Sequence, residues 1–113
     1  MKKHSWVQEF PISITITDQA GKIVEMNAKA AQTFEKDGGL KLIGQNVMSC
    51  HPEKAQVKLR DIRDNQKTNV YTIEKAGVKK LVYQAPWYQD GEYAGVAELA
   101  IDIPFEMPHF VRD

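Results

Sequence analysis

The fold is decided by residues 12–28, which read ISITITDQAGKIVEMNA. In the first six of these residues, three isoleucines alternate with one serine and two threonines, a period of two that is typical of a β-strand. The next four residues, Asp18–Gly21, end in glycine and predict a tight turn, so residues 22–26 return as the second strand of a hairpin. Asn27 is a preferred helix N-cap, and the alanines that follow it favour a helix over residues 28–34.

Downstream of this hairpin the sequence predicts one longer helix and three further strands. Ala55, Leu59 and Ile62 are spaced by four and three positions, which marks the buried side of a helix over residues 52–64. The strands are expected at residues 69–74, 78–88 and 93–103, separated by glycine-containing turns. Pro86 cannot donate a ladder hydrogen bond, so we expect it at a sheet edge or a bulge. The pattern predicts an α+β fold in which helices cover one face of an antiparallel sheet.

The two ends of the chain lie outside these elements. Trp6 and Phe10 are four residues apart, which suits one face of a short helix, and we expect residues 1–10 to form an N-terminal cap segment. Residues 104–113 contain two prolines and are expected to form a C-terminal tail that runs over the surface. A length of 113 residues fits one domain spanning residues 1–113.

Composition and charge narrow the class of protein. Hydrophobic residues make up 42% and charged residues 27% of the chain, which is typical of a folded globular domain. Fifteen basic and fifteen acidic residues cancel, so charge gives no reason to expect nucleic acid or a membrane as a partner. The single cysteine, Cys50, cannot form an internal disulfide, and no apolar stretch follows the N-terminal lysines. We therefore expect a cytoplasmic protein.

Taken in order, these segments resemble a PAS domain over about residues 8–103. The positions that carry the resemblance are the hairpin from Ile14 to Asp18 and Gly21 to Ala28, the Ile43-Gly44 step, the Asp90-Gly91 turn and Gly95-Val96. Residues 50–54, CHPEK, are similar to a prokaryotic PAS subgroup that has His-Pro before the long helix. The resemblance implies a five-stranded antiparallel sheet in the order 2-1-5-4-3, with helices on one face and a cleft between them.

The same resemblance implies a function. PAS domains hold haem, flavin, small acids or nothing in the cleft, so the chain is expected to be a sensory, signal-transduction domain that binds a small ligand or cofactor. It would signal through protein–protein contacts, as a homodimer or with a signalling partner. The residues expected to line the cleft are Met26, Phe34, Met48, His51, Leu59, Ile62, Tyr71, Tyr83, Trp87 and Leu99.

Strand parity assigns faces to the last two strands. Tyr83 and Trp87 have the parity of Leu81 and Ala85, so they share one sheet face; they either line the cleft or fill a core or dimer face. Candidate dimer contacts are Ala94, Val96, Ala100 and the Trp6/Phe10 stripe. Glu98 and Asp102 share a face of the last strand, and we expect them to be ordinary surface acids.

His51 is the strongest candidate for a polar functional residue. A neutral imidazole can ligate haem iron, which would make the protein a haem-based gas or redox sensor; alternatively His51 caps the long helix or bonds to the preceding loop. Haem-binding PAS relatives carry the ligating histidine within that helix, whereas His51 precedes it. The cofactor therefore stays unknown.

The sequence gives less support to a flavin adduct, a metal site or catalysis. A flavin–cysteine adduct expects an Asn-Cys-Arg-Phe-Leu-type run, which is absent. Cys50 and His51 are adjacent and should point apart, and no further cluster completes a metal site or a nucleophile–base pair. We expect no metal site and no enzymatic activity, and keep a small enzyme on a PAS-like scaffold as the alternative.

Overall fold

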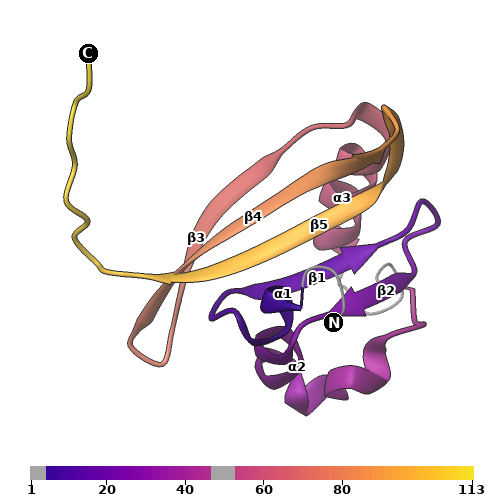
Figure 1. The fold of residues 1–113 in the computed structure, drawn as a ribbon, viewed down its shortest axis with the longest axis horizontal. Helices are drawn as coiled ribbons and strands as arrows, with labels where there is room; N and C mark the ends of the chain where they lie inside the picture. Colours follow the sequence, from indigo (N-terminus) through magenta and orange to yellow (C-terminus); the bar gives the residue numbers. More distant parts are fainter. Residues whose placement is uncertain (1–4, 47–52) are drawn as a thin grey trace.

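A computed structural model describes residues 5–46 and 53–113, and its centre is one five-stranded antiparallel sheet (Figure 1). The strand order is β2-β1-β5-β4-β3, as the sequence predicted. The strands are β1 (Ser13–Thr17), β2 (Ile23–Met26), β3 (Asn69–Lys75), β4 (Val78–Gln89) and β5 (Glu92–Ile103). The predicted hairpin and the three downstream strands are confirmed to within one or two residues.

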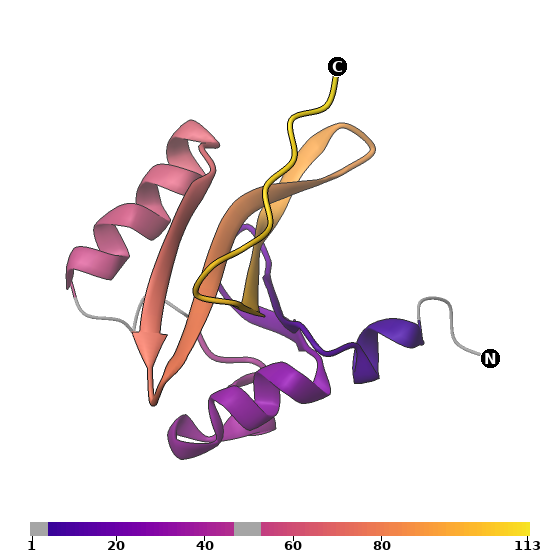
Figure 2. The same ribbon diagram turned by 90° about the vertical axis from the view of Figure 1, so that its left-hand side faces the viewer.

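Helices fill the connection between β2 and β3. They are α2 (Ala28–Thr33), the 3₁₀ helices η1 (Glu35–Asp37) and η2 (Gly39–Leu42), and α3 (Glu53–Asn65); a short α1 (Trp6–Glu9) precedes β1. In Figure 2, α3 stands beside the long strands while α2 and the 3₁₀ helices lie near one end of the sheet. The predicted N-terminal helix is confirmed, and the Trp6 and Phe10 rings meet edge to face with centroids 5.3 Å apart.

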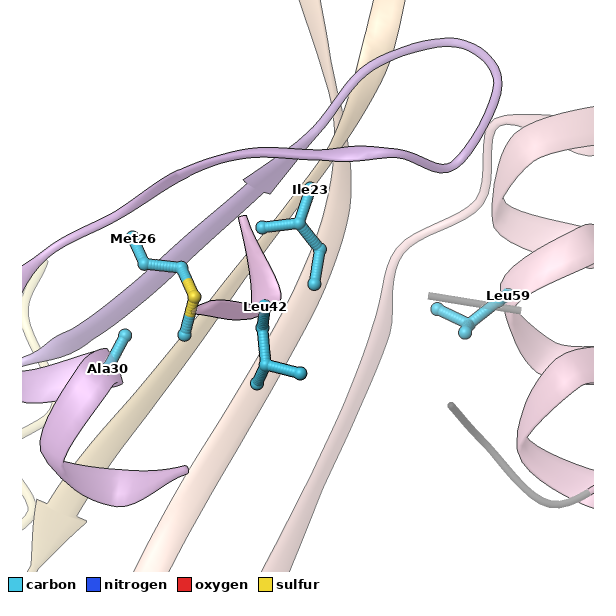
Figure 3. Close-up of a cluster of buried hydrophobic side chains, with 5 residues drawn as sticks. All are labelled: Ile23, Met26, Ala30, Leu42 and Leu59. Carbon is cyan, nitrogen blue, oxygen red and sulfur yellow. The ribbon is translucent and has the colours of Figure 1, made fainter. Parts of the chain in front are cut away.

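The hydrophobic core joins the helices to the sheet. It consists of Ile23, Met26, Ala30, Leu42 and Leu59, with Phe34 packed against it. Figure 3 shows Leu59 pointing from α3 toward the other four side chains. Ile62, one turn further along α3, is only 1% exposed, and burial of such a side chain contributes about 1.5–3 kcal/mol.

Asn27 is the polar centre of the fold and is 1% exposed. Its side-chain oxygen accepts hydrogen bonds from the backbone N–H groups of Ala30 and Ile14, both at 3.0 Å. Its amide nitrogen donates to the carbonyls of Ile12 at 2.7 Å and Val7 at 3.0 Å. The predicted N-cap therefore caps α2 and at the same time fixes α1 and β1 against it.

The two faces of the sheet differ in composition. On the covered face, which carries the helices, Ser13, Thr15 and Thr17 of β1 are buried. On the opposite, open face, Ile14 and Ile16 of β1 are half-buried. Register continues this division across the sheet, because Thr15 pairs with Glu98 and Ile14 with Leu99.

Two further expectations concern Pro86 and the tail. Pro86 pairs with Val96 of β5, while β3 begins opposite Gln84, so the other side of β4 is unpaired at Pro86. The expectation of an edge position is confirmed locally. The tail after Ile103 has no regular structure and departs from the sheet (Figure 1), which corrects the expectation that it runs over the surface. Its Phe105, Phe110 and Val111 side chains are exposed.

Candidate functional site

A cavity of about 390 Å³ lies between the helices and the covered face of the sheet. Both layers contribute to it. The sheet supplies β1 with its turn, β2 and β5, and the helical layer supplies the C-cap of α2, the 3₁₀ helices and α3. The lining residues are Thr15, Thr17, Asp18, Gln19, Gly21, Ile23, Met26, Phe34, Asp37, Leu42, Gln45, Leu59, Arg63, Tyr93, Val96 and Glu98. Its volume is in the range of small-molecule sites.

The walls and the rim of this cavity differ in polarity. Most of the buried lining residues are apolar: Ile23, Met26, Leu42, Leu59 and Val96. The exposed lining residues Gln19, Asp37 and Gln45 form its solvent side. An apolar interior with a few placed polar groups is the usual composition of a ligand pocket.

The end of β1 is held tightly against β5 at one side of the cavity. The Thr17 hydroxyl accepts a hydrogen bond from the Val96 N–H at 3.1 Å and donates to the Val96 carbonyl at 3.3 Å. The Trp87 indole N–H donates to the Thr17 carbonyl at 2.9 Å. Gly95 has φ +149°, and a Cβ there would lie 1.9 Å from the Thr17 carbonyl oxygen. Only glycine allows this approach.

The charged groups of the lining are mainly acidic. They are the carboxylates of Asp18, Asp37 and Glu98 and one guanidinium, that of Arg63. The Arg63 Nε donates to the Asp64 carboxylate at 2.8 Å, which raises the pKa of Arg63 and lowers the pKa of Asp64. The cation of the described lining is therefore already paired on the surface of α3.

Two tyrosines near the site have shifted pKa values. Burial raises the pKa of Tyr93, which lines the cavity. Burial, and then the nearby Glu98 carboxylate, raise the pKa of Tyr71. Both phenols are therefore held in the neutral form at physiological pH, where they can donate a hydrogen bond.

A second, smaller cavity of about 270 Å³ adjoins the first. It is lined by Lys58, Leu59, Asn69, Val70, Tyr71, Gln84 and Glu98. Leu59 and Glu98 line both cavities. The two spaces therefore share one residue of α3 and one of β5.

The structure brings some of the predicted site residues together. Met26, Phe34 and Leu59 line the main cavity, and Tyr71 lines the second. Ile62 is buried in the core beneath α3 and is absent from both linings. Met48 and His51 lie outside the described residues.

The expected orientation of β4 and β5 needs correction. Glu98 and Val96 of β5 line the cavity, so the alternate residues Leu99 and Gly95 lie on the open face. Tyr83 pairs with Leu99 and Trp87 pairs with Gly95, which places both aromatic residues on the open face too. Tyr83, Trp87 and Leu99 therefore do not line the cleft. Conversely, the candidate dimer contact Val96 points into the cavity, and Ala100 has the same parity.

Sequence reasoning missed the polar residues of the cavity. Thr15 and Thr17 were interpreted only as strand formers, and Glu98 was expected to be a surface acid, whereas all three line the cavity. Asp102 does behave as expected: it is half exposed and lies 3.4 Å from Lys80. The available signal was the unbroken Ser/Thr parity of β1, which predicts one continuous polar face.

In residues 5–46 and 53–113, no three His, Cys, Asp or Glu side chains come together as a metal site requires. No helix in these ranges has the length and apolar character needed to cross a bilayer.

A sheet in the order 2-1-5-4-3 whose one face is closed by helices over a cavity defines the PAS fold, and solved structures show this chain to have it. No protein-family model matches the chain, nor does any curated protein. A C-terminal domain from Streptococcus mutans is 22% identical with a TM-score of 0.69, over 86% of this chain and 79% of that one.

Two further solved structures are named as PAS proteins. The PAS domain of a protein from Colwellia psychrerythraea is 20% identical, with a TM-score of 0.64 over 86% of this chain and 90% of that one. The Aer2 receptor from Vibrio cholerae, described as a dual PAS-heme oxygen sensor, is 19% identical, with a TM-score of 0.61 over 82% and 95%. The resemblance found in the sequence is confirmed at the level of the fold, while membership of the His-Pro subgroup stays a prediction.

Proposed function

We propose that this protein is a sensory domain that binds a small ligand in the main cavity and signals its occupancy through protein–protein contacts. The observation that carries the proposal is the cavity itself: about 390 Å³ between the sheet and the covering helices, lined by mostly apolar buried residues together with Thr15, Thr17 and Glu98 of the sheet. The Aer2 receptor, which shares the fold, is described as a sensor. A cytoplasmic location and the absence of catalysis belong to the same proposal.

The open face of the sheet is the proposed contact surface. It carries Leu81, Tyr83, Leu99 and Ile101, which are half-buried or exposed. Contiguous apolar surface of this kind marks interaction sites in folded proteins. We propose a second copy of the chain as the partner, with a separate signalling protein as the alternative.

Haem is the second candidate because the Aer2 receptor is described as a haem sensor. The described lining fits haem poorly: it contains no imidazole or thiolate, and its three carboxylates would repel the haem propionates. His51, the ligand suggested by the sequence, lies outside the described residues. A Soret band in the purified protein that disappears in His51→Ala would establish this candidate instead.

Native mass spectrometry of the purified protein tests the main proposal. We expect a bound mass or ligand-dependent thermal stabilisation, lost in Leu59→Phe or Val96→Phe, each of which fills the cavity. The matched control Val24→Phe places the same ring at an exposed position and should leave binding unchanged. A folded Leu59→Phe or Val96→Phe protein that binds as the unaltered protein does would refute a ligand site here.

A further inference from the structure

The two edges of the sheet differ in how their backbone is paired. The outer side of β2 is covered by the loop after η2: the Ile23 N–H donates to the Gln45 carbonyl at 2.8 Å, and the Gly44 N–H donates to the Ile23 carbonyl at 2.7 Å. An isolated bridge between Lys22 and Asn46 extends this cover. At the other edge, β3 pairs with β4 alone, and no further described segment pairs with its outer side (Figure 1). One edge is therefore protected and the other is open.

The open edge lacks the features by which proteins usually prevent edge-to-edge pairing. Such features are short strands, prolines, bulges and charged side chains. β3 is seven residues long, contains no proline and pairs with β4 without a register shift. Its charged residues, Glu74 and Lys75, lie at its end, after a run of strong strand formers. Within that run Val70, Tyr71 and Ile73 are 49%, 41% and 40% exposed, so the strand presents apolar side chains beside unpaired backbone.

A second β3 fits this edge by symmetry. A two-fold axis normal to the sheet brings two β3 strands together antiparallel, with matching faces on the same side. Pairing all seven residues of Asn69–Lys75 places the middle residue, Thr72, opposite its own copy. Tyr71 then lies opposite Ile73 of the second copy, once on each side of the axis. Aromatic–β-branched pairs and Thr–Thr pairs are among the cross-strand pairs that stabilise antiparallel sheets.

The remaining residues of β3 also suit this register. Val70 lies opposite Glu74 of the second copy, and Asn69 lies opposite Lys75, so no two like charges are directly opposed. Moving the axis by one residue in either direction leaves two residues of each strand unpaired and separates Tyr71 from Ile73. The register centred on Thr72 is therefore the one that pairs the whole strand.

We propose that the outer edge of β3 pairs with β3 of a second copy, so that two sheets join into one continuous sheet. The unpaired backbone N–H and C=O groups supply the hydrogen bonds, and Tyr71, Thr72 and Ile73 supply the cross-strand contacts. One pair of seven-residue strands is small beside a stable interface, which buries about 800 Å² per partner, so this contact is weak and transient on its own. It requires neither the open face nor the main cavity.

Cysteine crosslinking of the full chain tests this register. In a Cys50→Ser background, single cysteines are bridged by a thiol reagent whose span matches the about 5 Å between paired strands. Thr72→Cys should give a crosslinked dimer, because Thr72 meets its own copy. Val70→Cys and Glu74→Cys should each give none alone, since their thiols would lie about 13 Å apart along the strands. Their mixture should give the dimer, because these two positions are opposed.

The Ile101→Lys substitution separates this contact from the proposed contact across the open face. Crosslinking of Thr72→Cys should persist in Ile101→Lys protein, because β5 lies two strands in from the edge. If crosslinking disappears there, the edge inference is overturned and the open face is what brings the chains together. Failure of Thr72→Cys to crosslink would also overturn it, as would equal crosslinking of Glu74→Cys alone. Neither result bears on whether a ligand binds in the cavity.

Discussion

Strand β1 reverses the usual distribution of polarity between the covered and open faces of this sheet, whereas β2 keeps it by burying Ile23 and Met26 on the covered face. The covered face presents Ser13, Thr15 and Thr17 from β1 and Glu98 from β5, while the open face presents isoleucines and leucines. A single-layer sheet ordinarily packs its apolar face under the helices and leaves its polar face in water. The difference teaches that polar side chains of β1 lie at the cavity beneath the helices, while its apolar side chains lie on the face that we propose as the contact surface.

The largest expected effect concerns the point where β1 approaches β5. Gly95→Ala places a Cβ 1.9 Å from the Thr17 carbonyl oxygen, so the strands that define both faces must separate. We expect a loss of about 3 kcal/mol or more in the free energy of unfolding, measured by urea denaturation. Gly91→Ala, at a turn where a Cβ meets nothing within 4 Å, is the control and should cost about 1–2 kcal/mol from its positive φ alone. If Gly95→Ala and Gly91→Ala lost equal free energies of unfolding, the close approach of Gly95 to Thr17 would not be the cause of the loss.

A second prediction compares two threonines of the covered face, Thr17 and Thr15. Thr17→Val leaves the N–H and carbonyl of the buried Val96 without their side-chain partner, so we expect a loss of about 1–3 kcal/mol. Thr15→Val removes a hydroxyl that bonds to no described residue, so the free energy of unfolding should change by less than about 0.5 kcal/mol. Similar losses in the two variants would show that the Thr15 hydroxyl is structural.

The open face is tested through self-association. Ile101→Lys puts a charge amid the apolar residues of that face, and we expect the dimer dissociation constant to rise at least about 10-fold, the effect of losing one substantial interface residue. Val57→Lys on the exposed side of α3 is the control. Sedimentation velocity over a concentration series measures both. A monomeric unaltered protein would contradict the proposed contact surface.

The smallest expected effect is at high pH. Burial raises the pKa of Tyr71 and Tyr93 above the usual value of 10.0, so the unfolded chain loses these protons first. Stability from these groups is complete below about pH 10 and declines as the pH rises through their folded pKa values. Tyr71→Phe and Tyr93→Phe should each reduce this decline in thermal unfolding between pH 8 and 11. A slope unchanged by either substitution would contradict the burial of these phenols.

The sequence predicted the strands and turns because their signals are local. Alternating β-branched residues, the Asp18–Gly21 turn and the Asn27 cap each act over a few residues. The faces could not be assigned in this way, because alternation shows that two faces differ but not which one the helices cover. Leu99 therefore looked like a cavity residue and Glu98 like a surface acid. Only the long-range register of β1 with β5 corrects both.

The hydrogen bonds of Asn27 connect the N-terminal segment to the helix that leads to the cavity wall. A single amide group holds the carbonyls of Val7 and Ile12 on one side and the N–H groups of Ile14 and Ala30 on the other. A shift of α1 must therefore break these bonds or carry α2 with it, and α2 ends at Phe34, which lines the cavity. A displacement of the segment before β1 would in this way reach the wall of the cavity.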